Sequence, residues 1–236
     1  MTLDRRRFLE ITAASLGGAL LSSCNANPEK AKPLLALAER GNEVVERGLF
    51  RHTAMNDVAS SAHVAGDAFP KYFVSDDVPT LDAAAARAWR LEVSGAVKRP
   101  LSLSLDDLMK LPRITQKVDH FCVEGWNARA TWSGVRVSDL ARVAGATDDA
   151  HFVDFAGFDK GYHESWDMES AMHPQTLVAY GMDGSLLTPG HGAPARVHSP
   201  IKLGYKNTKY LTRVVFMPMR NGGYWSDEGY EWFGGT

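Results

Sequence analysis

The 236-residue chain has few cysteines, no long apolar run and no excess of charge of either sign. Two cysteines are too few for a scaffold that is held together by disulfides. No stretch of 18 or more apolar residues occurs, which excludes an ordinary membrane-spanning helix. The 26 basic and 28 acidic residues nearly balance, so the composition provides no general attraction for nucleic acid. With 44% hydrophobic residues, the chain can still bury a sizeable core.

Several common motifs are also missing. There is no His-Glu-x-x-His or Cys-x-x-Cys spacing, which argues against a zinc site despite the eight histidines. There is no glycine-rich loop of the dinucleotide-binding or P-loop kind. The sequence also lacks the Cys-x-x-Cys-His motif that attaches haem.

The N-terminal residues have the features of an export signal. Residues 5–9 read Arg-Arg-Arg-Phe-Leu, and an apolar run follows over residues 11–21. This pattern resembles the twin-arginine signal, whose pathway exports proteins that are already folded. Residues 21–24, Leu-Ser-Ser-Cys, resemble a bacterial lipobox, which makes Cys24 a candidate for lipidation. We therefore expect a periplasmic protein, exported by the twin-arginine route, with Cys24 as a candidate lipid anchor.

The rest of the chain alternates short apolar segments with turns. Hydrophobic periodicity predicts a helix over residues 34–47, ended by Gly48, after a polar spacer at 25–32. Further on, the patterns predict strands at 89–94, 114–123, 151–155 and 211–217, and short helices after Ser104 and at 138–143. Such short strands separated by turns predict a mixed α+β, β-rich single domain.

We expect three regions along the chain. They are a signal segment with a lipobox at residues 1–24, a linker and helical extension at 25–62, and the α+β domain at 63–236.

Cys122 is the one cysteine outside the signal region, in the segment His120-Phe-Cys122-Val-Glu124-Gly-Trp126. A strand that runs into a glycine turn would present this thiol at the mouth of a pocket. Three interpretations are open on the residues alone. Cys122 is a catalytic nucleophile beside His120, a metal ligand, or a buried inert thiol.

The flanking sequence narrows these choices. Residues 120–126 with 132–140, residues 189–211 and residues 222–230 form three ordered blocks. They closely resemble the molybdopterin-binding domain of the sulfite oxidase family. The resemblance extends from about residue 63 to the C-terminus. It is strongest to the exported bacterial branch, which includes the catalytic subunit of periplasmic methionine sulfoxide reductase.

The resemblance implies an exported molybdenum-dependent oxidoreductase with a Mo-molybdopterin cofactor. Cys122 lies at the position of the family's molybdenum ligand and is the residue expected to be essential for catalysis. Two more sulfur ligands come from the dithiolene of the cofactor, and the soft ligand set suits a metal that cycles between Mo(VI) and Mo(IV). The implied reaction is two-electron oxo transfer on a small substrate, a sulfite-like oxyanion or a sulfoxide.

The resemblance also implies a set of cofactor contacts. The phosphate of the cofactor needs basic side chains and backbone N–H groups. The residues at the matching positions are Tyr72, His120, Gly157, His191, Arg196, Asn207, Thr208 and Lys209. Of these, Arg196 and the segment 207–209 are expected to hold the phosphate.

The substrate entrance is expected near the C-terminus. Four aromatic residues there are candidates to line a funnel: Tyr224, Trp225, Tyr230 and Trp232. Two acidic residues, Glu164 and Asp167, are candidates to face the same opening.

We expect a monomer with a separate redox partner. The chain leaves no room for the C-terminal dimerisation domain of the sulfite dehydrogenase branch. Electrons would therefore be exchanged with a separate cytochrome or a membrane haem or quinone protein. Three alternatives remain at this point. They are a periplasmic cysteine hydrolase or transpeptidase that uses Cys122 and His120, a non-catalytic lipoprotein binding module on the same fold, and an electron-transfer or assembly subunit.

Overall fold

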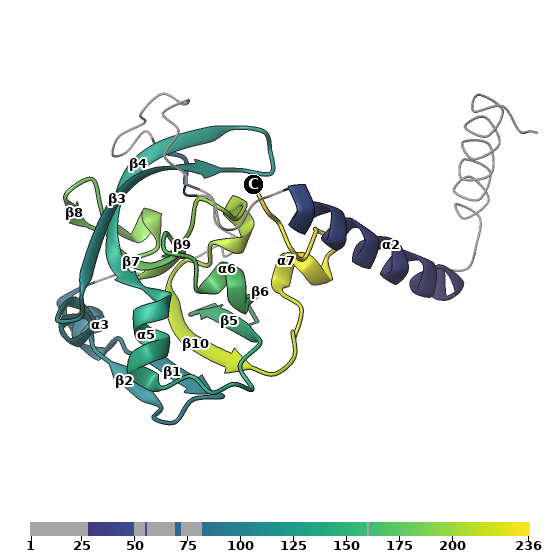
Figure 1. Ribbon diagram of the computed structural model, residues 1–236. Coiled ribbons are helices and arrows are strands. Elements are labelled where there is room, and N and C mark those ends of the chain that lie inside the picture. Colours follow the sequence, from purple (N-terminus) through teal and green to yellow (C-terminus); the bar gives the residue numbers. More distant parts are fainter. Residues whose placement is uncertain (1–27, 50–54, 56–68, 72–81, 160) are drawn as a thin grey trace, which may run out of the picture. The chain divides into compact units, whose positions relative to one another are not determined.

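The structure is a computed structural model that describes residues 28–49, 55, 69–71, 82–159 and 161–236 (Figure 1). The expected signal segment, the expected boundary at residue 63 and Tyr72 lie outside the described residues. The chain divides into two compact units, Met1–Val45 and Glu46–Thr236, which are described separately. Among the described residues, no helix combines the length and the apolar character needed to cross a membrane.

Helix α2 (Pro28–Leu49) is longer than predicted. It begins six residues before residue 34, so the expected spacer at 25–32 is partly helical. The reason is that Glu, Lys and Ala at positions 29–31 favour helix. Gly48 lies inside the helix and does not end it. Apolar side chains including Leu34, Leu37 and Val44 are exposed on α2.

The second unit is built on two sheets. The first has the order β2-β1-β10-β5-β6, with β1 and β10 parallel and the other pairs antiparallel. Its strands are β1 (Leu91–Gly95), β2 (Leu101–Leu103), β5 (Phe152–Gly157), β6 (His163–Asp167) and β10 (Leu211–Met217). Strand β10 therefore brings the C-terminal part of the chain into the middle of the first sheet.

The second sheet has the order β3-β4-β7-β8, with β9 also paired to β7. Its strands are β3 (Arg113–Phe121), β4 (Asn127–Arg136), β7 (Leu177–Met182), β8 (Ser185–Leu186) and β9 (Arg196–His198). The β3–β4 hairpin is paired along its whole length, from Arg113 opposite Val135 to Phe121 opposite Asn127. Figure 1 shows this hairpin curving along one side of the unit, away from β10 and β5.

Short helices connect the strands. They are α3 (Ala83–Ala88), α4 (Leu105–Met109), α5 (Val137–Ala144), α6 (Met168–Ala171), α7 (Tyr224–Asp227), and the 3₁₀ turns η2 (Pro189–His191) and η3 (Gly204–Lys206). The predicted helix start at Ser104 is confirmed. The Ser104 hydroxyl accepts from the Asp107 N–H, and the Asp107 carboxylate accepts from the Ser104 N–H.

The core confirms the predicted β-rich α+β class. In β1, buried Leu91 and Val93 alternate with exposed Glu92, the pattern of a strand with one buried face. They pack with Phe155, Val214 and other residues of the first sheet in one apolar cluster. Strand β7 was missed because all six of its residues are buried, which leaves no alternation to detect.

Candidate active site

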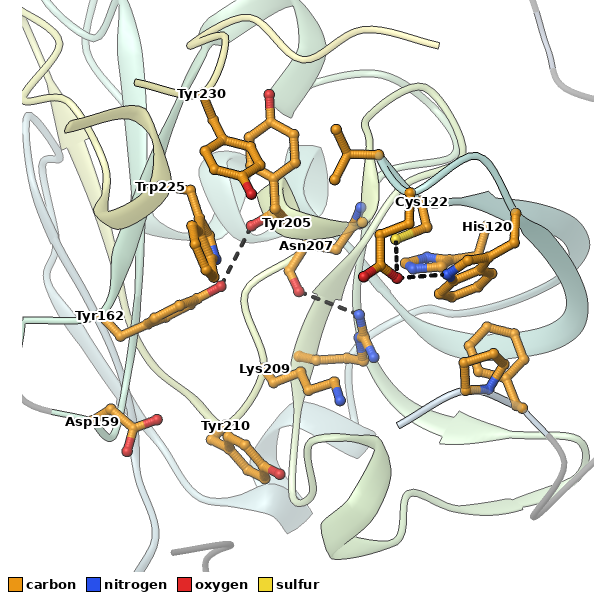
Figure 2. A pocket seen from close by; sticks show the side chains of 17 residues that line it. His120, Cys122, Asp159, Tyr162, Tyr205, Asn207, Lys209, Tyr210, Trp225 and Tyr230 are labelled. Atoms are coloured by element: carbon orange, nitrogen blue, oxygen red, sulfur yellow. Dashed lines mark hydrogen bonds between the residues drawn. The ribbon is translucent and has the colours of Figure 1, made fainter. Parts of the chain in front are cut away.

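A cavity of about 310 Å³ opens where loops from both sheets meet (Figure 2). Figure 2 shows Tyr162, Tyr205, Trp225 and Tyr230 on one side and Cys122 with His120 on the other. Lys209 and Asn207 lie between the two sides. The loops bring together predicted site residues that are far apart in the sequence: His120, Cys122, Arg196, Asn207 and Lys209.

Cys122 is placed by a tight turn at the end of β3. The Cys122 N–H donates to the Trp126 carbonyl at 2.9 Å, and the Gly125 N–H donates to the Cys122 carbonyl at 3.0 Å. Gly125 has φ +85°, a left-handed conformation that glycine adopts without strain. The Cys-x-x-Gly-Trp spacing therefore closes the turn and presents the thiol to the cavity.

Cys122 lies close to a carboxylate. Its Sγ is 3.7 Å from Glu124 Oε2 and donates to it, and the same oxygen accepts from Trp126 Nε1 at 3.0 Å. Partial burial raises the pKa of the Cys122 thiol, and the negative charge of Glu124 raises it further. The thiol therefore stays protonated until a metal ion replaces its proton.

His120 is buried beside Cys122, but it is not the partner of a catalytic dyad. Its imidazole lies 5.6 Å from the ring of Phe69 and is stacked at 5.5 Å on His198. Burial, followed by the charges of Arg196 and Lys209, lowers the pKa of His120 to about 3, so the ring is neutral. The described residues show no hydrogen bond between His120 and Cys122. A neutral histidine and a thiol of raised pKa are the opposite of an activated cysteine nucleophile.

Two cations, the buried Arg196 and the partly buried Lys209, face the cavity between these sides. Arg196 is 2% exposed, and its guanidinium donates to the carbonyls of His191 at 3.3 Å and Asn207 at 3.2 Å. Lys209 Nζ donates to the Gly190 carbonyl at 3.2 Å. Burial lowers the pKa of Arg196 to about 10. Burial and then repulsion from Arg196 lower the pKa of Lys209 to about 7. An anionic group between them would relieve this repulsion.

Asn207 and Thr208 support these cations through the backbone. Asn207 Oδ1 accepts from the Ser199 N–H at 2.7 Å, and its amide donates to the carbonyls of Lys202 and Leu203. Thr208 Oγ1 donates to the Phe155 carbonyl at 3.1 Å. Both side chains thus anchor the loop that carries Lys209, and Asn207 also lines the cavity.

Gly157 and His191 lie behind the cavity lining. A Cβ at Gly157 would be 3.0 Å from the Lys209 carbonyl oxygen, so glycine allows the Lys209 backbone to approach β5. The buried His191 ring lies edge-on to Phe69 at 5.8 Å.

The aromatic side of the cavity differs in part from the prediction. Trp225 and Tyr230 line it as expected, joined by Tyr162 and Tyr205, which the sequence patterns did not indicate. The expectation for the other four residues was wrong. The ring of Tyr224 packs on Tyr162 outside the lining, at 5.3 Å. Trp232, Glu164 and Asp167 are buried and do not line the cavity. Trp232 donates to Ser165 of β6, Glu164 accepts from the Trp225 N–H, and Asp167 accepts from the Ser170 N–H of α6.

The residues present fit a phosphate-bearing molybdenum cofactor. Among the described lining residues, the Cys122 thiol faces the cavity together with two cations, the buried Arg196 and the partly buried Lys209. In the described part of the chain, no group of three or more His, Cys, Asp and Glu residues could hold a metal ion. The donor set is thus the one expected for a metal that brings most of its ligands with it.

Comparisons with known proteins agree with this chemistry. The "Oxidoreductase molybdopterin binding domain" family matches residues 76–225, more than half of the chain. A "Putative protein-methionine-sulfoxide reductase subunit" from Azospira oryzae is 38% identical, over 98% of this chain and 88% of that protein. A protein-methionine-sulfoxide reductase catalytic subunit from Ralstonia nicotianae is 30% identical, over 91% of this chain and 69% of that protein.

A solved structure is similar in fold. It is the sulfane dehydrogenase from Paracoccus pantotrophus, with a TM-score of 0.56 and 24% identity, over 60% of this chain and 40% of that one. The family match and the similarity to these relatives identify the chain as a molybdopterin-dependent oxidoreductase of the sulfite oxidase family.

Proposed function

We propose that the chain is the catalytic subunit of a reductase for methionine sulfoxide and related small sulfoxides. The observation that carries the proposal is the cavity itself. It holds the Cys122 thiol, Arg196 and Lys209 together with a wall of aromatic side chains. The names of the Azospira and Ralstonia relatives support the choice of sulfoxide over sulfite.

The chain's own residues would hold the cofactor at two ends. The Cys122 thiolate would ligate molybdenum, while Arg196 and Lys209 would bind the phosphate. Asn207 and Thr208 would hold the loop that carries Lys209 against it. His120, Gly157, His191 and Tyr72 remain proposed cofactor contacts. When bound, the cofactor supplies a centre that exchanges two electrons and an oxygen atom with the substrate.

Cys122 has to lose its proton to act as a ligand. Glu124 Oε2 already accepts the thiol hydrogen bond at 3.7 Å, so it is the carboxylate placed to take that proton as the thiolate forms. The Trp126 indole N–H, 3.0 Å from the same oxygen, fixes the orientation of the carboxylate. These contacts position the ligand before the cofactor enters.

The aromatic wall suits a sulfur-containing side chain. Thioethers make favourable contacts with aromatic rings, and Tyr162, Tyr205, Trp225 and Tyr230 supply such rings opposite Cys122. They would exclude water from the reacting sulfur and orient the methyl thioether of the product (Figure 2).

We also propose where the protein works and with what. The Arg-Arg-Arg-Phe-Leu segment at 5–9 and the lipobox support export by the twin-arginine route, with Cys24 as the lipid anchor in the periplasm. Relatives that are named as subunits support a separate electron-transfer partner, a cytochrome or a membrane haem or quinone protein. The protein itself would be monomeric.

The test begins with protein purified from cells that synthesise molybdopterin. We expect about one molybdenum per chain, following from ligation by the Cys122 thiolate. The protein should reduce methionine sulfoxide with a reduced dye as electron donor faster than it oxidises sulfite with an oxidised dye as electron acceptor. Cys122→Ser should lose turnover, because a hydroxyl is a harder and poorly ionised ligand. A full rate in Cys122→Ser, or folded active protein without molybdenum, would refute the assignment.

A further inference from the structure

Glu164 on β6 is completely buried and contacts two separate parts of the aromatic wall. Its Oε2 accepts from Lys206 Nζ at 2.6 Å and from Ser226 Oγ at 3.2 Å. Its Oε1 accepts from the Trp225 backbone N–H at 2.9 Å. The exposed fraction of both the Glu164 and the Lys206 side chain is 0%. One carboxylate therefore makes three polar contacts out of reach of water.

These contacts connect the two halves of the wall. Trp225 belongs to the last segment of the chain, residues 222–236, which we call the C-terminal strap. Tyr205 precedes Lys206 in η3, on a different loop. The rings of Trp225 and Tyr230 lie 5.0 Å apart, and those of Tyr205 and Tyr230 lie 5.3 Å apart. Glu164 holds the strap through Trp225 and the η3 loop through Lys206.

The close approach of the strap to β6 requires glycine at position 223. Gly223 pairs with Glu164 in an isolated β-bridge, and a Cβ at Gly223 would collide with the Glu164 carboxylate. Ser165, next on β6, donates to the Gly222 carbonyl and accepts from Trp232 Nε1 at 2.9 Å. The strap is therefore seated by side chains of β6, with the Glu164 carboxylate directly under Trp225.

Glu164 and Lys206 do not line the cavity. A buried ion pair is weak evidence for stability, because desolvation offsets most of the attraction between the charges. Its geometry is nevertheless specific, since the carboxylate must accept all three hydrogen bonds at once. The contacts therefore favour a role for Glu164 in placing the residues of the aromatic wall.

We propose that Glu164, paired with Lys206, is a positioning residue that sets the spacing between Trp225 and Tyr205 and so determines which sulfoxides the cavity admits. This inference rests on the proposed function, because it assumes that the cavity receives a sulfoxide. A wall held at fixed spacing grips a methionine-sized side chain. Without the Glu164 carboxylate, the wall would bind a methionine-sized side chain poorly. Its binding of a very small sulfoxide would change little.

The test compares two substrates in the holoenzyme. The variant Glu164→Gln/Lys206→Met removes both charges and leaves no lone buried ion. We expect KM for methionine sulfoxide to rise about tenfold with kcat within about twofold, and kcat/KM for dimethyl sulfoxide to change less than about twofold. Ser226→Ala, which removes one hydrogen bond to Glu164, should shift KM in the same direction by about two- to threefold.

Lys202→Met is the matched control. Lys202 is also a buried lysine, and it donates to the Phe233 carbonyl of the same strap at 2.6 Å, but it does not line the cavity or contact Trp225. We expect this variant to lose stability without changing the ratio of KM values for the two sulfoxides. Molybdenum content should stay at the wild-type level in every variant.

A second measurement does not depend on activity. Amide hydrogen exchange over residues 223–230 should speed up in the Glu164→Gln/Lys206→Met variant, and less so in Lys202→Met. If the paired variant does not fold, Ser226→Ala alone decides the question. Equal losses on both sulfoxides, or unchanged exchange over 223–230, would overturn the positioning role. A molybdenum-loaded wild type that reduces neither sulfoxide would instead overturn the proposed function.

Discussion

Cys122 shows how a residue's surroundings decide its chemistry. Burial and the Glu124 carboxylate raise the pKa of the thiol by more than the nearby backbone N–H groups lower it, and the neighbouring histidine is neutral. A cysteine protease would need the reverse arrangement. The environment is suited to a thiol that stays unreactive until a metal ion replaces its proton.

The first prediction tests this environment in protein made without cofactor. Glu124→Gln should lower the pKa of the Cys122 thiol, because it removes the negative charge and the carboxylate hydrogen bond that raise it. Alkylation of Cys122 at pH 8 should then be several-fold faster than in the parent. A Cys24→Ala background makes Cys122 the only thiol, since the chain has two cysteines. Equal alkylation rates would show that burial alone controls the thiol.

Lys209 presents a second case at the residue scale. Its pKa of about 7 in the folded chain lies below the usual 10.5. Between these values the unfolded state binds more protons than the folded state, so folding stability rises with pH. The penalty of charging the lysine is fully present below pH 7 and is relieved as the pH increases.

The second prediction follows from this sign. In the cofactor-free protein, the free energy of unfolding should increase from pH 7 to pH 9, and Lys209→Met should show a smaller increase. The Lys209→Met variant should still show part of the increase in unfolding free energy with pH, because burial also lowers the pKa of Lys202 to about 7. Urea denaturation at several pH values measures both slopes. Lys209→Met should also load less molybdenum, whereas a steeper slope in the variant would contradict the assignment.

At the scale of elements, the β3–β4 hairpin carries Cys122, the proposed metal ligand. A bidentate ion pair joins its strands just before the Cys122 turn. Arg129 Nε and Nη2 donate to the two Asp119 oxygens at 2.7 and 2.8 Å, and both side chains are buried. The two residues are also direct cross-strand partners. The pair therefore holds the register of the strand end that positions Cys122.

The third prediction concerns this pair. Arg129→Met should cost about 3–5 kcal/mol of stability, because Asp119 is left as a buried charge without its guanidinium. The double variant Asp119→Leu/Arg129→Met should cost less than the single one. Ser104→Ala is the comparison, since loss of a helix cap costs about 1 kcal/mol away from the site. Denaturation midpoints give the energies, and an Arg129→Met protein as stable as Ser104→Ala would refute the role.

Local sequence patterns predicted some of these elements and missed others. The strand at 211–217 and the capped helix after Ser104 are confirmed, because alternation and capping are local signals. The strands β7 and β6 were not predicted. β7 is buried on both faces, and four of the five β6 residues are buried, including Glu164 and Asp167. The two carboxylates of β6 are stabilised in the interior by ion pairs with Lys202 and Lys206 and by further hydrogen bonds.

At the scale of the whole molecule, the cavity lies where the two sheets meet through their loops. Cys122 comes from the β3–β4 turn, Arg196 from β9, and Lys209 from the segment before β10. The apolar clusters of the two sheets fix these elements relative to one another. Without a bound anion, the repulsion between Arg196 and Lys209 destabilises this arrangement.

The fourth prediction is that cofactor binding stabilises the whole domain. A ligand that binds only the folded chain at 100 times its Kd adds about 2.7 kcal/mol, which raises Tm by about 5–10 °C for a chain of this size. Calorimetry of molybdenum-loaded and cofactor-free protein measures the difference. In Arg196→Met the difference should shrink, because the anion has lost one of its two cations. An equal Tm for loaded and cofactor-free wild type would contradict a site built around Arg196 and Lys209.

The sequence alone indicated the family, which the family match confirms. It also singled out Cys122 as the proposed ligand and Arg196 and Lys209 as proposed phosphate-binding residues, because they lie in contiguous motifs of the three ordered blocks. The tertiary structure decided which aromatic residues form the wall and what Glu164 does. The sequence patterns did not assign Tyr162 or Tyr205 to the wall, since these residues meet Trp225 only when the strap folds onto β6. Contacts between distant segments depend on the packing of both sheets, which no short stretch of sequence encodes by itself.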